Sequence, residues 1–197
     1  MLFRSDADYL VYFPKANNFF SELLVAGYQK YLEGNNLGLT NAVQTNVEIM
    51  NQYGQSGLQV DGYSRGGLTA GNAMEAVASQ SNAAGSLSNT NISLFGSAYN
   101  AQQAANLLNQ LGTEENHGGL QSTVHLDDFV GTVIGGNNPT GGTTPINSNL
   151  LKEWVKIFYG EATAHNCYGS GKSGCKDYWP TKSIPQTILP NIGGAKK

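Results

Sequence analysis

The sequence predicts an α/β fold in which a mostly parallel sheet is flanked by helices on both faces. Short apolar runs alternate with longer segments of helical periodicity along the chain. This alternation is typical of strand–helix–strand units, which build parallel sheets. The chain has 197 residues, and neither an internal repeat nor a break in composition divides it. We therefore expect a single domain over residues 1–197.

The first expected elements are a strand and two helices. Residues 8–13 are β-branched and aromatic and precede a proline, which predicts a short buried strand. Large apolar side chains recur at helical spacing over 17–34, between an asparagine that can cap the helix and a glycine that can end it. A second helix is expected over 40–54, with Val43 and Met50 on its apolar face.

The rest of the chain continues the same alternation. Apolar runs predict strands, and the segments between them have helical periodicity. Segments rich in Gly, Pro, Asn, Ser and Thr predict loops. The expected strands cover 57–63, 92–100 and 120–126, the expected helices cover 66–80, 101–112 and 148–162, and the expected loops cover 81–91 and 135–149.

Composition argues against nucleic-acid binding and against a transmembrane segment. The net charge is -3, and the basic residues are scattered. Because phosphate contacts need clustered Lys and Arg, nucleic acid is not an expected partner. No run approaches the roughly 18 apolar residues of a membrane-spanning helix, so no transmembrane segment is expected. The start of the chain also lacks the pattern of a signal peptide, so if this domain crosses a membrane, we expect something else to carry it.

The chain has two cysteines, Cys167 and Cys175, with a glycine-rich segment between them. This segment can fold back and bring the two sulfurs within disulfide reach, and a disulfide implies maturation outside a reducing cytosol. Two free thiols are the alternative. No histidine pair or Cys-x-x-Cys motif accompanies these cysteines, so we expect no zinc or other metal site.

The segment VDGYSRGGLTAGNAME places Ser64 between glycines, where an apolar strand meets a helix. A nucleophilic serine on a sharp strand-to-helix turn needs small residues two positions before and two positions after it. Gly62 and Gly66 meet this demand, and Gly67 relieves the contact between helix and strand further. The turn also presents the backbone N–H of Arg65 as an oxyanion donor. An ordinary glycine-rich turn is the alternative interpretation.

A serine nucleophile needs a general base, and the chain has three histidines. His117 lies in a polar loop and is expected to be a solvated surface residue. His125 ends an expected strand, where a structural role is equally compatible with the sequence. His165 lies in a loop after the last expected helix. It fits the order Ser, then Asp or Glu, then His that hydrolases with such a turn follow.

The acid must then lie between Ser64 and His165. Asp127 and Asp128 follow the strand expected over 120–126, at the same edge of the sheet as the serine. Adjacent residues point in opposite directions, so only one of the two carboxylates can orient the imidazole. The other acidic residues lie in a polar loop or on a helix face and fit less well. Turn formation or capping is the alternative role for this pair.

The motifs DGYSRGG, HLDDFVGTVIGG and AHNCYG, in this order, resemble the serine lipase and esterase branch of the α/β-hydrolases. In fungal-type (class 3) lipases the catalytic aspartate stands in an Asp-x-Val setting after a strand, and the histidine follows in a late loop. Asp128, with Phe129 and Val130, matches that setting. The resemblance therefore implies Asp128 rather than Asp127 as the acid and His165 as the base.

This resemblance implies a serine hydrolase of carboxylic esters, with lipid or phospholipid esters as the expected substrates and no cofactor. The His-Gly-Gly-Gly oxyanion motif of many esterases is missing. The second oxyanion N–H, beside that of Arg65, is therefore expected from Lys15 or Ala16. Two other functions stay open, namely hydrolysis of an amide or peptide bond and a non-catalytic binding or adhesin module on the same scaffold.

The segments VGTVIGGNNPTGG and AHNCYGSGKSGC also resemble the C-terminal hydrolase-like domains of bacterial filamentous haemagglutinin and contact-dependent inhibition proteins. This resemblance implies an antibacterial toxin domain that is secreted or delivered from the cell surface as part of a larger protein. Such a domain acts in the target bacterial cell. The resemblance also implies a cognate immunity protein as a partner.

Overall fold

The computed structural model describes residues 41–140, 149–159, 161–168, 174–175 and 184–193. Two expected elements, the strand at 8–13 and the helix at 17–34, lie outside these residues, and so do the expected oxyanion donors Lys15 and Ala16. Within the described part of the chain, alternating strands and helices follow the predicted order. The fold class is therefore α/β.

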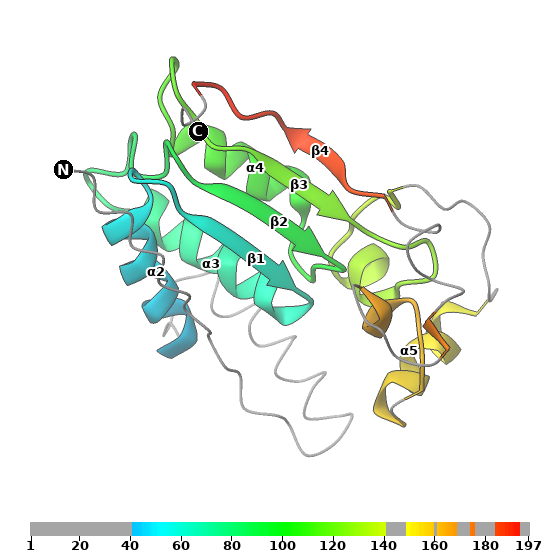
Figure 1. Ribbon diagram of the computed structural model, residues 1–197. Helices are drawn as coiled ribbons and strands as arrows, with labels where there is room; N and C mark the ends of the chain where they lie inside the picture. The colour runs from blue at the N-terminus through cyan, green and yellow to red at the C-terminus, as the bar shows by residue number, and fades with distance from the viewer. Residues whose placement is uncertain (1–40, 141–148, 160, 169–173, 176–183, 194–197) are drawn as a thin grey trace.

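The strands Gln59–Tyr63 (β1), Asn91–Phe95 (β2), Leu120–Thr123 (β3) and Gln186–Leu189 (β4) form one sheet in the described part of the chain. Their order in the sheet is β1-β2-β3-β4 (Figure 1). β1, β2 and β3 are parallel, whereas β4 pairs antiparallel with β3. The mostly parallel sheet is confirmed, and the sequence did not predict β4. Because the first three strands are parallel, their carboxyl ends meet at one edge of the sheet.

The described helices on the sheet lie on one face. These are Arg65–Ala78 (α3), which packs on β1, and Ala101–Gln110 (α4), which packs on β3 and β4. The two helices also contact each other, and Asn41–Tyr53 (α2) packs against α3 (Figure 1). Helix cover of the opposite face stays a prediction, because the helix expected at 17–34 lies outside the described residues.

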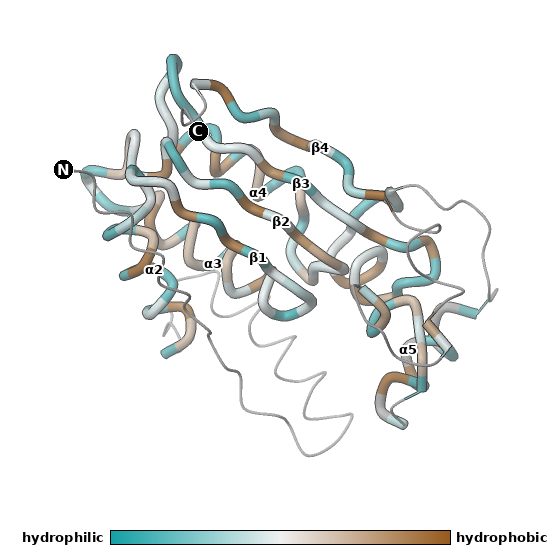
Figure 2. Tube along the Cα trace, in the orientation of Figure 1, coloured by the Kyte–Doolittle hydropathy of each residue, from teal (hydrophilic) through white to brown (hydrophobic). Residues whose placement is uncertain are grey.

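A buried apolar core lies between the sheet and these helices. Apolar and polar residues alternate along β1 (Figure 2). Along β2, Ile92 and Leu94 are buried, whereas their neighbours are exposed or half-buried. Both residues belong to one cluster with Leu68 and Met74 of α3 and Leu108 of α4. Burying each large side chain contributes about 1.5–3 kcal/mol to the free energy of unfolding. This packing therefore holds the strands, with their carboxyl ends, in place on the helices.

Two strands end earlier than the sequence predicts. β2 was expected to reach residue 100 but ends at Phe95, because Gly96 turns the chain with a φ of 50°. β3 was expected to reach residue 126 but ends at Thr123. The next N–H, that of Val124, bonds the Thr140 hydroxyl at 2.9 Å instead of a neighbouring strand. Both connections therefore leave the sheet before the residues that form the site.

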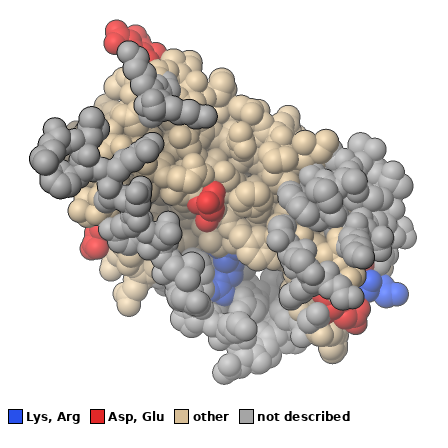
Figure 3. Space-filling view, viewed as in Figure 1, with Lys and Arg blue, Asp and Glu red and all other residues tan. Residues whose placement is uncertain are grey.

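Asparagine side chains cap two of the described helices. The Asn100 side chain caps α4 by accepting the Gln103 N–H at 3.0 Å. The Asn149 side chain caps Leu150–Phe158 (α5) by accepting the Lys152 N–H at 2.9 Å. No helix in the described part of the chain combines the length and apolar character that a membrane span needs. Charged side chains lie at separate places on the face in Figure 3, and the described residues form no basic cluster there.

Candidate active site

Ser64 occupies a strained turn between β1 and α3. Its φ of 54° and ψ of -121° make it the one non-glycine residue with positive φ among those described. Such a conformation costs about 1–3 kcal/mol and persists only when its surroundings hold it. The Ser64 N–H donates to the Phe95 carbonyl at 3.0 Å, and the Ala98 N–H donates to the Ser64 carbonyl at 3.1 Å. The neighbouring strand end therefore holds the strained backbone on both sides of the side chain.

The glycines around Ser64 do not share one role. A Cβ at Gly62 would lie 2.8 Å from the Gly67 Cα, and a Cβ at Gly67 would collide with the Ser97 side chain. These two glycines let α3 pack closely on β1. A Cβ at Gly66 would meet nothing within 4 Å. The expectation that Gly66 must be small because neighbouring backbone crowds it is therefore wrong, and Gly67 meets that need instead.

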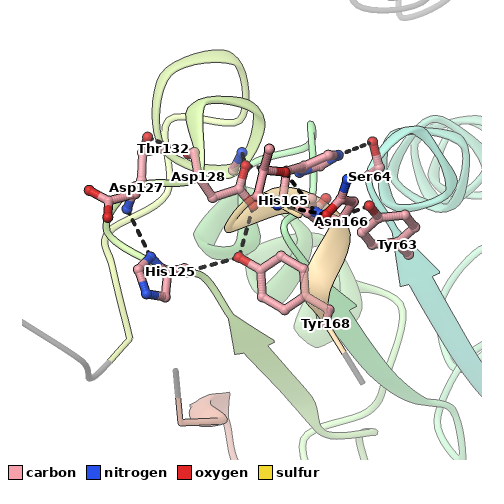
Figure 4. Close-up of polar contacts among 12 residues, drawn as sticks. Tyr63, Ser64, His125, Asp127, Asp128, Thr132, His165, Asn166 and Tyr168 are labelled. Atoms are coloured by element: carbon pink, nitrogen blue, oxygen red, sulfur yellow. Dashed lines mark hydrogen bonds and ion pairs between the residues drawn. The ribbon is translucent and has the colours of Figure 1, made fainter. Parts of the chain in front are cut away.

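The Ser64 side chain points away from its own helix terminus. A serine directly before a helix usually caps it through its hydroxyl. Here the side chain makes no capping bond, and its Oγ lies 2.8 Å from Nε2 of His165 (Figure 4). A local rule of helix structure is thus broken at the residue expected to be the nucleophile. Such exceptions are typical of functional positions.

His165 lies between Ser64 and Asp128 and is 5% exposed. It begins a 3-10 turn, His165–Cys167, and its Nδ1 lies 2.8 Å from Oδ1 of Asp128. Because an ionised carboxylate can only accept hydrogen bonds, Nδ1 must donate the proton of this bond. In the neutral ring, Nε2 is then an acceptor for the Ser64 hydroxyl. The three groups form one line in which the serine faces an available base.

Asp128 is fully buried and held by hydrogen bonds on both carboxylate oxygens. Oδ1 also accepts the Gly131 N–H at 3.0 Å, and Oδ2 accepts the Tyr168 hydroxyl at 2.8 Å. The sequence predicts that Asp128 stands at the end of β3, but the structure places it elsewhere. It lies beyond the strand in a turn whose Asp128 N–H donates to the His125 carbonyl at 3.0 Å. The turn, rather than the strand, aims the carboxylate at His165.

Asp127 and His125 lie beside the site but outside the line of three groups. The Asp127 side chain points away from His165 (Figure 4), and its N–H donates to Nδ1 of His125 at 3.0 Å. The backbone N–H of His125 donates to the Tyr168 hydroxyl at 2.7 Å, so His125 supports the residue that binds Asp128. The structure thus brings Asp128, and not Asp127, to His165.

His117 is buried, which contradicts the expectation of a solvated surface residue. It is 5% exposed, and its backbone pairs with Ile192 through hydrogen bonds of 3.1 Å. Its Nδ1 lies 3.0 Å from the Gly118 carbonyl. The chain that follows β4 covers this loop, and the sequence did not predict β4. His117 precedes β3 and so lies at the opposite end of the sheet from Ser64.

Two tyrosines in contact with the site were missed by sequence reasoning. Tyr63 directly precedes Ser64, and Tyr168 follows His165 by three positions, so their place within the quoted motifs was the available signal. Burial and the nearby charge of Asp128 raise the pKa of Tyr168 well above its usual value. Its hydroxyl therefore stays protonated and donates to Asp128 across the ordinary pH range.

Gly96 at the end of β2 leaves room for the buried groups. A Cβ at this position would collide with Oδ2 of Asp128 and would lie 3.2 Å from Nδ1 of His165. The positive φ of Gly96 also disfavours any residue with a side chain. The residue that follows β2 is therefore a glycine because the side chains of Asp128 and His165 occupy the space beside it.

The two cysteines form a disulfide, which confirms the pairing expected from their spacing and excludes two free thiols. Cys167 and Cys175 are both buried and pack with Ala164. Cys167 belongs to the same short turn as His165. The bridge therefore restrains the segment that carries the expected base.

Arg65 begins α3 directly after Ser64, so its N–H lies at the positive end of the helix dipole. This position agrees with its expected role as an oxyanion donor. Lys15 and Ala16 lie outside the described residues, so the second donor stays a prediction. In the described part of the chain, no three His, Cys, Asp or Glu side chains gather as metal ligands do.

Comparison with known proteins finds no match to a protein-family model, to a curated protein or to a solved structure. The chemistry of the site is therefore inferred from its own contacts. The site lies beyond the carboxyl ends of parallel strands, where open α/β sheets bind their ligands. At that edge it combines a strained serine, a buried histidine and a buried carboxylate.

Proposed function

We propose that this protein is a serine hydrolase of carboxylic esters with an α/β-hydrolase fold. The observation that carries the proposal is the line Ser64–His165–Asp128, in which both hydrogen bonds are 2.8 Å long. A serine hydroxyl is a weak nucleophile until an adjacent base takes its proton, and the base in turn needs an orienting group. The strand–turn–helix geometry around Ser64 and the chain order of the three residues support the α/β-hydrolase fold.

The proposed reaction has two steps. Ser64 Oγ attacks the ester carbonyl carbon while Nε2 of His165 takes the hydroxyl proton. The Asp128 carboxylate stabilises the resulting imidazolium, and the Arg65 N–H donates to the oxyanion. Nε2 then gives the proton to the leaving alkoxide, and an acyl group stays on Ser64. Water attacks this acyl group with Nε2 as base, which releases the acid and restores the serine.

The strain at Ser64 favours catalysis over a non-catalytic binding module. A module that only keeps the scaffold has no need for a serine with a φ of 54° and no cap bond. Lipid or phospholipid esters are the proposed substrates on the resemblance to class 3 lipases. Amide and peptide bonds yield to the same chemistry, so the reaction products must distinguish these substrate classes.

The proposed biological role is that of an antibacterial effector carried by a larger exported protein. The segments that resemble the toxin domains support it, and the disulfide agrees with maturation outside a reducing cytosol. The proposed substrate is then a lipid of the target cell, and a cognate immunity protein protects the producing cell by blocking the site.

The test compares the purified protein with Ser64→Ala on a short-chain p-nitrophenyl ester and on extracted bacterial lipids. We expect Ser64→Ala to lower the rate by about 10⁴-fold or more, because the serine, base and acid act as a unit. A fluorophosphonate should label the wild-type protein at Ser64, as the mass of the modified peptide will report. Expression inside bacteria should slow growth only for the wild type.

Ser79→Ala is the matched control. Ser79 lies at the other end of α3, and its hydroxyl bonds the Ala76 carbonyl at 2.7 Å. This variant should keep the wild-type rate. A Ser64→Ala protein that folds and still hydrolyses the ester at the wild-type rate would end the proposal. Release of amines from peptides without release of acids from esters would move the activity to the alternative substrate class.

A further inference from the structure

Tyr63 contacts His165 in two ways. The two rings are stacked, with their centroids 5.1 Å apart and an interplanar angle of 25°. The Tyr63 hydroxyl donates to the backbone carbonyl of His165 at 2.7 Å (Figure 4). Side chain and backbone of the histidine are therefore both held by one residue. That residue is the last of β1 and directly precedes Ser64.

The segment that carries His165 has its own internal hydrogen bonds. The Asn166 side chain accepts the Thr163 N–H at 2.8 Å and donates to the Glu161 carbonyl at 2.5 Å. These bonds fix the shape of the segment, and the disulfide joins it to Cys175. Neither of them links the segment to β1. The contacts of Tyr63 provide that link, and they do so one residue away from the nucleophile.

We propose that Tyr63 is a positioning residue that keeps His165 at its working distance from Ser64. The inference rests on the proposed function. Tyr63 is the last residue of β1 and Ser64 follows it directly, so the residue that holds His165 and the proposed nucleophile move together. A displacement of about 1 Å between reacting groups can lower a rate about 100-fold, so this coupling bears directly on turnover.

The stacked ring also matters during the reaction. When Nε2 takes the serine proton, the imidazole becomes a cation, and the face of an aromatic ring within about 6 Å attracts a cation. The ring centroids of Tyr63 and Tyr168 are 6.2 Å apart, and the Tyr168 hydroxyl donates to Asp128. Burial and the Asp128 charge raise the pKa of Tyr63, so its hydroxyl stays a donor. These contacts act after the substrate has bound, so their loss should lower kcat rather than raise KM.

Two substitutions separate the contacts. Tyr63→Phe keeps the ring and removes the hydroxyl bond, and we expect kcat to fall about threefold to tenfold. Tyr63→Leu removes both contacts, and we expect kcat to fall about 30-fold to 100-fold with KM within about twofold of the wild type. The rate at which a fluorophosphonate labels Ser64 should fall in parallel, because labelling also needs the base.

Val77→Ala is the control for a loss of stability. Val77 is fully buried in α3, outside the contacts of the site. This variant should lower the melting temperature and leave kcat and the labelling rate unchanged. Tyr63→Leu should show the opposite pattern, with a loss of kcat that exceeds what its melting temperature explains.

Several results would overturn the inference. The first is a kcat of Tyr63→Leu that equals the wild-type kcat, whether or not its KM is raised. The second is a Val77→Ala protein that has the same melting temperature as Tyr63→Leu and loses as much kcat. If Tyr63→Leu does not fold, an unchanged labelling rate in Tyr63→Phe contradicts the positioning role of Tyr63. Ser64→Ala separates the two proposals. If Ser64→Ala is inactive and the Tyr63 variants match the wild type, only the role of Tyr63 fails. If wild-type activity and labelling do not depend on Ser64, the proposed function fails and the inference fails with it.

Discussion

Ser64 combines two departures from ordinary local structure. Its backbone has a positive φ, and its side chain leaves the start of α3 uncapped. The backbone strain costs about 1–3 kcal/mol, and a missing cap costs about 1 kcal/mol. Both departures accompany a side-chain position in which the Ser64 hydroxyl points toward His165. Stability is given up at one residue, and the Ser64 hydroxyl meets the imidazole of His165.

The acid of the site provides a prediction at the same scale. In Asp128→Asn the amide N–H₂ donates to Nδ1 of His165, so the neutral ring carries its proton on Nε2 and cannot accept from Ser64. If the proposed function holds, we expect kcat/KM to fall about 10⁴-fold, as loss of the correct tautomer does in serine proteases. The measurement is ester hydrolysis by protein whose folding is verified by circular dichroism.

Asp127→Asn is the matched comparison, because it makes the same chemical change one residue away. The Asp127 side chain points away from His165, so we expect the rate to stay within about threefold of the wild type, as for a side chain outside the reacting line. Losses of similar size at both positions would show that the two carboxylates act together. The hydrogen bond between Asp128 and His165 would then not distinguish the role of Asp128 from that of Asp127.

At the scale of elements, three parallel strand ends build the site. Ser64 follows β1, Gly96 follows β2 and Asp128 lies beyond β3, so the sheet order sets the distance between Ser64 and Asp128. His165, the proposed base, comes from the 3-10 turn that follows α5. The disulfide closes a short loop within the segment that carries this turn, and side-chain bonds join the turn to Tyr63, Ser64 and Asp128. The position of His165 therefore depends on side-chain contacts and on the shape of its own segment.

We predict that removal of the Cys167–Cys175 bridge lowers hydrolysis more than thermal stability. The bridge spans eight positions, and so short a loop contributes about 2–3 kcal/mol of stability. Its larger effect should fall on kcat, because Cys167 shares a turn with His165 and a small displacement of the base is costly. Cys167→Ala with Cys175→Ala avoids burying new polar groups. Rates, melting temperatures and the mass of the non-reduced protein are the measurements, and full activity after complete reduction would contradict the prediction.

At the scale of the whole molecule, the sheet and one helical layer form a single buried core. The same packing buries tyrosine hydroxyls. Burial raises the pKa of Tyr99, and its hydrogen bond to Glu75 raises it further. Burial and the nearby charge of Asp128 also raise the pKa of Tyr168. The charged form of each is disfavoured in the folded state, so these residues link proton binding to folding.

The free energy of unfolding should therefore fall at alkaline pH. Below the usual tyrosine pKa of 10.0 both states hold these protons, and the stabilising contribution is complete. Above it the unfolded chain releases protons that the folded chain retains, so unfolding is favoured increasingly as pH rises toward the folded-state pKa. Urea unfolding between about pH 8 and pH 11 measures this slope, and tyrosinate absorbance should increase together with unfolding. Tyr99→Phe should flatten the slope, and a free energy that stays constant through this range would refute the linkage.

The sequence by itself determined the order of the described elements up to β3 and the position of Ser64, the proposed nucleophile, between β1 and α3. Helical periodicity and glycines around one serine are local patterns, so they could be read without knowledge of distant contacts. Ser64, Asp128 and His165 were selected by such patterns together with a family resemblance. The spacing of the cysteines also predicted their bridge.

Only the tertiary structure decided how these residues meet. It ended β2 and β3 earlier than predicted, paired β4 with β3, buried His117 and moved the steric requirement from Gly66 to Gly67. It also added Tyr63 and Tyr168 to the site. Each of these features depends on atoms from segments far apart in the chain. Their contacts arise from packing and burial in three dimensions, and no periodicity or spacing in the sequence encodes them locally.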